Sequence, residues 1–330
     1  MKAVIYTKYG GTDVLEIQDI PRPDPKPNEV LIKIFATTVT PVDTAFRSGD
    51  PKIARLFTGL FKPKKSILGT ELSGVIESIG ANVTTFKPGD RVFAAAPDGF
   101  GAHAQYIAMA EDAAISLIPD DLGYEDTVAI CNGGLTALPF LRDNAKLQAG
   151  QKILIIGAAG SIGTVAVQLA ASLKAEVTGV CSTSNIEMVH ALGAEHVIDY
   201  SYQDYRTSGQ TYDVIFDTVG KSSFAEARGS LTPNGIYLTT VPDFAAVISP
   251  MLPFLHGGKR AKMAATGLRK DADKIKDMSI LKDMISAGDL TTVIDRSYPL
   301  EQIATAHEYV ENGHKRGNLI ITVDHPALQI

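Results

Sequence analysis

The chain has 330 residues, of which 45% are hydrophobic and 21% charged, and its net charge is −6. This length favours two domains, and the composition is that of a globular protein rather than a disordered chain. The negative charge, without a basic stripe in the sequence, argues against nucleic acid as a main partner. Two cysteines without a CxxC motif, an N-terminus without a signal-peptide h-region and a longest apolar stretch too short to span a bilayer predict a cytoplasmic protein without membrane insertion.

The first 125 residues are predicted to form short strands and turns, without long helical periodicity. Strands are predicted at 30–35, 74–79 and 91–95, and a proline-rich connector occupies 21–27. A helix is predicted over 120–137, because two acidic residues lie in its first turn. This part of the chain is therefore expected to be a small, irregular β-domain.

From Gly150 onward, apolar β-branched runs alternate with helical segments. Strands are predicted at 152–156, 176–181, 196–198, 212–217, 235–239 and 262–266. Helices are predicted between them at 162–173, 186–192 and 224–231. This alternation indicates a parallel, doubly wound sheet with right-handed crossovers. The final stretch is predicted as a helix at 272–287, a strand near Val293, a helix at 301–311 and a strand at 319–323, most of it packed against the N-terminal domain.

A glycine-rich segment follows directly on the strand predicted at 152–156, and a helix is predicted to begin at once after it. Such a strand–turn–helix lets the backbone approach a pyrophosphate and aims a helix N-terminus at its negative charge. The alternative is a glycine-rich turn that only packing requires. On the first interpretation, the cofactor contacts come from Gly157, Ala159, Gly160, Ser161, Ile162 and Gly163.

The choice of cofactor is expected to depend on the end of the strand at 176–181. NAD sites usually place an acid there, which accepts hydrogen bonds from the ribose 2′-hydroxyl. Here the side chains are small hydroxyls and amides, with Ser182, Thr183 and Asn185 as candidates, and the nearest acids along this segment are Glu176 and Glu187. This favours NADPH, although no Arg or Lys occurs at 180–192. The alternative, compatible with the first, is that residues 182–185 simply cap the next helix.

Further motifs are spread over nearly the whole chain. They are Leu68-Gly69-Thr70-Glu71-Leu72-Ser73-Gly74-Val75, Lys87-Pro88-Gly89-Asp90-Arg91-Val92, Gly101-Ala102-His103-Ala104-Gln105-Tyr106, Leu192-Gly193-Ala194, Val197-Ile198-Asp199-Tyr200 and His314-Lys315-Arg316-Gly317-Asn318. Together with the glycine motif, they resemble the medium-chain dehydrogenase/reductase superfamily, specifically its zinc-free quinone oxidoreductase-like branch.

The resemblance implies an α/β fold of two domains. A GroES-like, β-rich catalytic domain would be built from residues 1–124 and 267–330. A Rossmann domain with a doubly wound parallel sheet would bind NADP(H) with residues 125–266. The resemblance further implies an active site in the cleft between the domains, and a homodimer formed through the edge of the cofactor sheet.

The resemblance also predicts that this chain binds no metal. Zinc alcohol dehydrogenases of the superfamily use a Cys, a His and a third ligand around zinc. The corresponding positions here are Thr40, Thr70 and Asn132, with Cys131 one residue early, and the four-cysteine structural lobe is missing after Val92. Because Thr and Asn are poor zinc ligands, no metal ligands are assigned.

Without a Lewis acid, removing a proton from a simple alcohol as hydride leaves is difficult near neutral pH, whereas a quinone or enone already delocalises the incoming charge. The protein then needs only to orient a small, hydrophobic, conjugated carbonyl or quinone substrate and to supply a hydrogen-bond donor. The candidates are Thr40, Asp43, Thr70 and Asn132. Structural alternatives are a hydrogen bond or salt bridge for Asp43 and a satisfied strand end for Thr70. No general acid is assigned, so the proton is expected to come from water.

Several residues have two interpretations of equal standing. Glu71 matches an acid that is frequent near the family's active site, or it is a partner for a buried Arg. Thr136 matches a family threonine beside the nicotinamide, or it bonds back to the preceding turn of its helix. Tyr200 is placed to stack on adenine or to reach the 2′-phosphate, with core packing as the alternative.

Backbone contacts with the cofactor are expected from Val219, Gly220 and Val241, because they follow strands at the carboxyl edge of the sheet. The family's tail predicts further contacts from Arg316 and Asn318, while a solvated turn is the simpler interpretation of Lys315. Two apolar segments, 53–61 and 244–255, are candidate walls of the acceptor pocket, and the second is equally a candidate dimer interface.

The leading functional hypothesis is an NADPH-dependent reductase of quinones or α,β-unsaturated carbonyl compounds. One alternative is a zinc-free NADP(H)-dependent alcohol dehydrogenase or aldehyde reductase. A second, non-enzymatic alternative is an NADPH-binding sensor or moonlighting protein. The sequence does not identify the physiological acceptor of the hydride.

Overall fold

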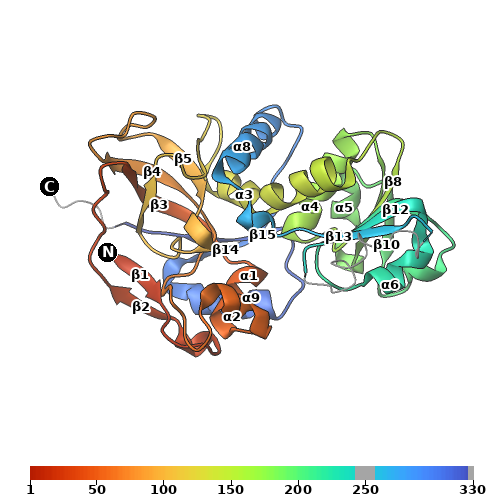
Figure 1. Ribbon diagram of the computed structural model, residues 1–330, viewed down its shortest axis with the longest axis horizontal. Coiled ribbons are helices and arrows are strands. Elements are labelled where there is room, and N and C mark those ends of the chain that lie inside the picture. Colours follow the sequence, from red (N-terminus) through yellow and green to blue (C-terminus); the bar gives the residue numbers. More distant parts are fainter. Residues whose placement is uncertain (242–256, 326–330) are drawn as a thin grey trace. The chain divides into compact units, whose positions relative to one another are not determined.

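The computed structural model describes residues 1–241 and 257–325 of the chain, which forms two compact units (Figure 1). Unit 1 comprises Met1–Asn132, Lys270–Ser286 and Ile294–Ile330, and unit 2 comprises Gly133–Arg269 and Ala287–Val293. Among the described helices, none is long and apolar enough to cross a membrane. The candidate pocket wall at 244–255 lies outside the described residues.

Unit 1 is built on a seven-stranded sheet in the order β14-β15-β3-β4-β5-β7, with β6 paired to β3. Its strands are β3 (Glu29–Thr38), β4 (Glu71–Ile79), β5 (Arg91–Ala95), β6 (Tyr106–Ala110), β7 (Ile115–Leu117), β14 (Ile294–Pro299) and β15 (Asn318–Thr322). β15 pairs antiparallel with β3, so the C-terminal strand completes a sheet begun near the N-terminus. A separate two-stranded sheet joins β1 (Lys2–Ile5) and β2 (Glu16–Asp19).

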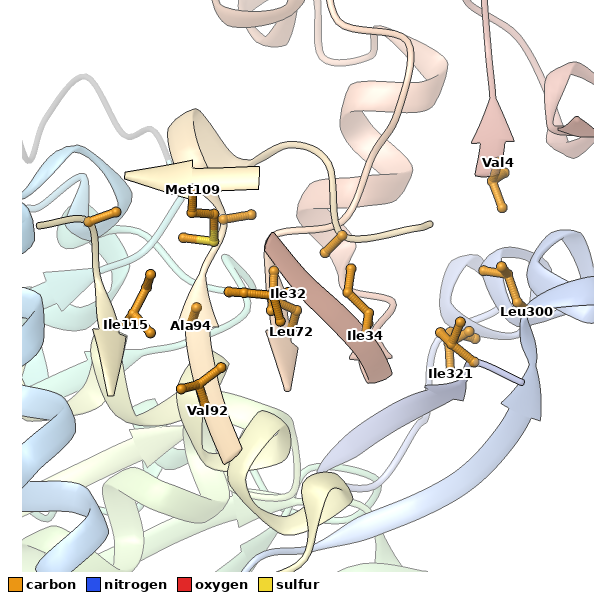
Figure 2. Close-up of a cluster of buried hydrophobic side chains, with 14 of the residues drawn as sticks. Val4, Ile32, Ile34, Leu72, Val92, Ala94, Met109, Ile115, Leu300 and Ile321 are labelled. Atoms are coloured by element: carbon orange, nitrogen blue, oxygen red, sulfur yellow. The ribbon is translucent and has the colours of Figure 1, made fainter. Parts of the chain in front are cut away.

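A cluster of buried hydrophobic side chains joins several strands of this sheet in unit 1 (Figure 2). Ile32 and Ile34 of β3 are fully buried, and they share a face because side chains alternate along a strand. Leu72 of β4 and Ile321 of β15 pack into the same cluster. Each such buried aliphatic side chain contributes roughly 1.5–3 kcal/mol by leaving water. Segments from both ends of the chain therefore share one core.

The helices of unit 1 are α1 (Pro41–Ser48), α2 (Arg55–Thr58), α8 (Asp271–Ser286) and α9 (Ile303–Glu311), together with the first part of α3 (Tyr124–Pro139). α1 begins with a capping box, in which the Thr40 side chain accepts from the Asp43 amide and the Asp43 side chain accepts from the Thr40 amide. Near the end of α1, the buried Arg47 forms an ion pair with Glu311 of α9. These contacts tie an N-terminal helix to a C-terminal one.

Unit 2 contains a six-stranded sheet in the order β10-β9-β8-β11-β12-β13, and every neighbouring pair is parallel. Its strands are β8 (Lys152–Ile156), β9 (Glu176–Cys181), β10 (His196–Asp199), β11 (Tyr212–Asp217), β12 (Leu231–Thr239) and β13 (Arg260–Met263). Its helices are α4 (Ser161–Ser172), α5 (Ile186–Ala191) and α6 (Phe224–Ala227), with the rest of α3 and a π-helical turn at Phe140–Ala145. The direction of chain progression reverses between β8 and β11. In open α/β sheets, ligands bind at the carboxyl ends of the strands at such a point.

The predicted elements are largely confirmed. The strands predicted at 91–95, 152–156, 176–181 and 212–217 have the predicted bounds. Two predictions need correction in their second halves. The helix predicted at 224–231 ends as α-helix at Ala227, because Leu231 already begins β12. The strand predicted at 262–266 ends at Met263, and Thr266–Leu268 is a 3-10 turn.

The N-terminal segment was expected to be all strands and turns, and this is wrong in one respect. Two helices, α1 and α2, lie between β3 and β4. Both are short, eight and four residues, so their sequences do not carry the several turns of periodicity by which an amphipathic helix is recognised.

Candidate active site and cofactor site

The glycine-rich segment of unit 2 forms the turn between β8 and α4. Gly157 has a φ of +79°, a conformation that favours glycine, and Gly160 is the N-cap of α4. Gly160 has no side chain to cap the helix, and among the described residues no side chain is seen to accept from its first amide groups. A twelve-residue helix that begins in this way offers N–H donors and the positive end of its dipole to an anion.

The glycines of this turn are required for different reasons. A Cβ on Gly163 would lie 2.1 Å from the Gly157 carbonyl oxygen, and one on Gly157 would lie 2.6 Å from a Val219 methyl group. Packing alone therefore demands glycine at these two positions. A Cβ on Gly160 would meet its nearest neighbour at an ordinary 3.5 Å. The packing alternative thus explains two glycines and does not explain Gly160, for which a cofactor contact stays a prediction.

Four of the predicted cofactor residues lie around the ends of β9 and β10. The Asn185 amide nitrogen donates to Ser182 Oγ at 2.9 Å, and Thr183 Oγ1 donates to Asp199 Oδ2 at 2.5 Å. Tyr200 directly follows β10, and its side chain is about half exposed. These contacts bring Ser182, Thr183, Asn185 and Tyr200 together at the carboxyl edge of the sheet.

The sequence interpretation missed Asp199 as a neighbour of this group. Only acids within 176–187 were compared there, whereas Asp199 arrives from the adjacent strand, sixteen residues after Thr183. The parallel pairing of β10 with β9 puts Asp199 opposite Cys181. The available signal was the position of Asp199 at the end of the next strand, because carboxyl ends of neighbouring parallel strands share one edge.

The residues after β11 and β12 have their amides engaged within the protein. The amides of Val219 and Gly220 donate to Asp217 Oδ1 at 3.0 and 2.8 Å, and the Val241 amide donates to Thr239 Oγ1 at 3.2 Å. The Val241 carbonyl also accepts a hydrogen bond, from Thr239 Oγ1 at 3.2 Å, so the backbone groups left for a ligand are the carbonyls of Val219 and Gly220. Cofactor contacts from them remain a prediction.

Thr136, a predicted neighbour of the nicotinamide, lies in the part of α3 that belongs to unit 2. Its hydroxyl oxygen is 3.4 Å from the hydroxyl oxygen of Thr266. A contact of Thr136 with the cofactor stays a prediction.

A buried acid in unit 1, Glu71, forms hydrogen bonds with three polar side chains. Its carboxylate accepts from Thr38 Oγ1 at 2.7 Å, Thr70 Oγ1 at 2.6 Å and Asn132 Nδ2 at 3.0 Å. Burial raises the pKa of Glu71, as does the nearby Asp43 carboxylate, while the three hydrogen bonds oppose this shift. Two of the predicted catalytic residues, Thr70 and Asn132, thus meet around one carboxyl group, which is hydrogen-bonded by neutral donors rather than held by an arginine.

The other two predicted catalytic residues, Thr40 and Asp43, hold the start of α1. Asp43 is fully buried; its Oδ2 accepts from the Thr40 amide and hydroxyl at 2.8 and 2.7 Å, and its Oδ1 accepts from the Gly69 amide at 3.1 Å. These are the structural hydrogen bonds proposed as the alternative for Asp43. A role of either residue toward substrate stays a prediction.

Three residues near the C-terminus, Lys315, Arg316 and Asn318, differ in how far they are exposed to solvent. The Lys315 ammonium donates to the Gly317 carbonyl at 2.5 Å, and burial lowers the pKa of Lys315 to about 8 against the attraction of Asp295 and Glu71. The solvated-turn interpretation of Lys315 is therefore wrong. Arg316 is exposed and its amide donates to Asp295 Oδ2, whereas Asn318 is buried at the start of β15.

Comparison with known proteins adds two family matches and several full-length relatives. Residues 26–120 match the alcohol dehydrogenase GroES-like domain, and residues 192–321 match a family described as zinc-binding dehydrogenase. A chloroplast envelope quinone oxidoreductase homolog of Arabidopsis thaliana is 31% identical over 336 residues, covering 97% of this chain and 98% of the relative. The chain belongs to the medium-chain dehydrogenase/reductase superfamily, in its quinone oxidoreductase-like branch.

Two further comparisons agree with this membership of the medium-chain dehydrogenase/reductase superfamily. An NADPH-dependent alkenal/one oxidoreductase of Arabidopsis thaliana is 28% identical, covering 97% of this chain and 79% of the relative. The solved quinone oxidoreductase of Coxiella burnetii is 28% identical, with a TM-score of 0.86 and coverage of 98% and 99% of the two chains. The expected fold class, a GroES-like domain with a Rossmann parallel sheet, is confirmed.

One matched family is described as zinc-binding, so the donor atoms of this medium-chain dehydrogenase/reductase chain decide whether zinc fits. The hydroxyls of Thr40 and Thr70 and the amide of Asn132 are poor zinc ligands. Burial raises the pKa of the Cys131 thiol well above its usual value, and the nearby Glu71 adds to this, so the thiolate is disfavoured. Across the described residues, no three His, Cys, Asp or Glu side chains are grouped to hold a metal. The residues do not fit a zinc ion.

Proposed function

We propose that this protein is an NADPH-dependent oxidoreductase that transfers hydride to quinones or α,β-unsaturated carbonyl compounds. The observation that carries the proposal is the β8–α4 turn, where Gly160 is not required by packing and lies at the uncapped start of a helix. Relatives named as quinone oxidoreductase and as NADPH-dependent alkenal/one oxidoreductase support the same cofactor and substrate class.

Unit 2 supplies the groups that hold NADPH. The amides at the start of α4 would bind the pyrophosphate, because the helix end is positive and its N-cap, Gly160, has no side chain. Ser182, Thr183, Asn185 and Tyr200, at the carboxyl edge of β9 and β10, would hold the adenosine ribose. When bound, NADPH supplies the hydride, and the residues of the chain only position the cofactor and the acceptor and polarise the acceptor's carbonyl group.

Unit 1 supplies the groups that act on the acceptor. Glu71 holds the Thr70 hydroxyl and the Asn132 amide in place by accepting a hydrogen bond from each, and burial raises the pKa of this carboxyl group. The second proton of the Asn132 amide would be the donor to the carbonyl oxygen of the acceptor, and the Thr70 hydroxyl would orient that oxygen. Uncharged donors suffice for a quinone or enone, because conjugation spreads the negative charge that hydride brings.

The experiment follows nicotinamide absorbance with NADPH and one quinone, one enone and one saturated aldehyde. We expect the quinone or the enone to react at least about tenfold faster than the aldehyde, a difference of about 1.4 kcal/mol in activation free energy. Prior dialysis against a strong chelator should leave these rates unchanged.

Each alternative function has its own outcome in this assay. Preference for the saturated aldehyde supports the alcohol dehydrogenase or aldehyde reductase alternative. Stoichiometric NADPH binding with no turnover on any acceptor supports the sensor alternative. A rate that falls on chelation and returns with zinc contradicts the proposed metal-free reaction.

We further propose a cytoplasmic homodimer, with the cofactor in unit 2 and the acceptor site in unit 1. Both cysteines, Cys131 and Cys181, are free and buried, as is usual in a reducing compartment. β13 pairs with β12 alone among the described strands, which leaves one edge of the parallel sheet for a second copy. The NADP(H)-binding segment is placed at about 125–266, and the catalytic segments at about 1–124 and 267–330.

A further inference from the structure

Asp199 places a carboxylate beside the segment that is expected to receive the 2′-position of the cofactor. It ends β10, pairs with Cys181 at the end of β9, and is 8% exposed. Its Oδ2 accepts from Thr183 Oγ1 and its Oδ1 accepts from the Ser201 amide at 2.9 Å. The hydrogen bond from Thr183 and those from Ser201 hold the pKa of Asp199 below its usual value, so the group is ionised at neutral pH.

No cation from the surrounding sequence offsets this charge. Residues 175–205 contain no Lys or Arg, although they contain five acids. The next basic residue, Arg206, forms ion pairs with Asp204 at 2.7 Å and with Glu226 at 3.1 Å. This segment of the chain therefore offers a 2′-phosphate none of the charge-assisted hydrogen bonds that Arg or Lys usually supplies.

The side-chain hydrogen-bond donors left at this edge are all uncharged. The Thr183 hydroxyl proton is used by Asp199, and one of the two Asn185 amide protons is used by Ser182 Oγ. Asn185 Oδ1 is buried and has no partner among the described residues, so it is an additional acceptor. The donors left are the hydroxyls of Ser182 and Ser184, 3.4 Å apart, the half-exposed Tyr200 hydroxyl and the second Asn185 amide proton. Acceptors match the hydroxyl of NADH, which can donate, better than a phosphate, which cannot.

We propose that Asp199 is a specificity-determining residue that weakens binding of the 2′-phosphate, so that this enzyme accepts NADH as well as NADPH. The proposal rests on the proposed function, because it concerns the cofactor of that reaction. It concerns the adenosine end of the cofactor, and it can therefore be tested without turnover.

The experiment measures calorimetric affinities of the whole chain for adenosine 2′,5′-bisphosphate and for adenosine 5′-monophosphate. In the wild type, we expect the two dissociation constants to differ by less than about tenfold. A site with an Arg fork on the phosphate would give about a hundredfold or more, from two charge-assisted hydrogen bonds.

The Asp199→Asn variant keeps a carbonyl oxygen for the Thr183 hydroxyl but removes the charge. We expect its affinity for the bisphosphate to rise by on the order of fivefold, since one nearby repulsion is lost, with less than about a twofold change for the monophosphate. The matched control is Glu195→Gln, which removes one exposed negative charge just before β10, at the opposite end of that strand. This control should leave both affinities unchanged.

The outcomes separate this proposal from the proposed function. A wild-type ratio above about a hundredfold, or an unchanged ratio in a folded Asp199→Asn protein, overturns the role of Asp199 while NADPH-dependent turnover still stands. If Asp199→Asn does not fold, the wild-type ratio alone decides. If neither fragment binds while NADPH binds, the adenosine end contributes too little for Asp199 to select between cofactors, so the role of Asp199 fails and the proposed function stands. If NADPH does not bind either, the proposed function fails as well.

Discussion

His307, in α9, is a titratable residue whose imidazole ring is buried without hydrogen bonds to the described residues. It is fully buried, neither ring nitrogen has a hydrogen-bond partner among the described residues, and its ring meets that of His103 edge-on at 5.9 Å. Burial lowers its pKa well below the usual value, and the charges of His103 and Arg47 act in the same direction. The residue is therefore neutral in the folded protein near neutral pH.

This depressed pKa predicts an acid-dependent loss of stability. Below about pH 6.5 the unfolded chain binds a proton at His307 that the folded chain does not, so the free energy of unfolding falls as the pH falls. One such group contributes a slope of about 1.4 kcal/mol per pH unit. In the His307→Phe variant, urea unfolding at pH 5.0 and 7.0 should show an acid-dependent loss smaller by about 1.5 kcal/mol than in the wild type.

The control for this prediction is His196→Asn, because the side chain of His196 is 64% exposed. That variant should keep the pH dependence of the wild type. An unchanged acid slope in a folded His307→Phe protein would show that His307 is protonated in both states, contrary to its burial.

At the scale of elements, the turn between β8 and α4 combines packing with ligand binding. The Gly163→Ala variant should lose about 2–3 kcal/mol of unfolding free energy, because its Cβ must displace the Gly157 carbonyl, 2.1 Å away. The Gly160→Ala variant should stay within about 1 kcal/mol of the wild type.

Gly160→Ala should affect NADPH binding much more than it affects stability. We expect Gly160→Ala to weaken NADPH binding by about tenfold or more in a fluorescence titration, because the added methyl group obstructs the approach of the pyrophosphate to the backbone. Wild-type affinity in this variant would mean that Gly160 serves only the turn.

The elements also show which local signals were reliable. β8, β9 and β11 were predicted with their observed bounds, because strands buried on both faces are continuous apolar runs. α1 gave no comparable signal, since its eight residues are held by the Thr40–Asp43 capping box and by the contact of Asp43 with Gly69. The second of these contacts joins residues 26 apart and is invisible to a local pattern.

At the scale of the whole molecule, the proposed homodimer predicts a measurable mass. Light scattering coupled to size exclusion should give about twice the 35.2 kDa of the chain, because pairing the β13 strands of two copies would cover the edge of each that has no partner among the described strands. A mass of one chain over a wide range of concentrations would contradict the dimer and leave the proposed reaction unaffected.

The sequence alone determined the parallel α/β sheet and the strand–turn–helix after residue 156, because periodicity and spacing record these local properties directly. The resemblance to a known family added the GroES-like domain and the positions 40, 70 and 132, where Thr and Asn are poor zinc ligands. Only the tertiary structure showed that Glu71 gathers Thr38, Thr70 and Asn132, that Lys315 is partly buried near Glu71, and that Asp199 lies beside Thr183. These contacts join residues far apart in the chain, and strand order and burial decide them.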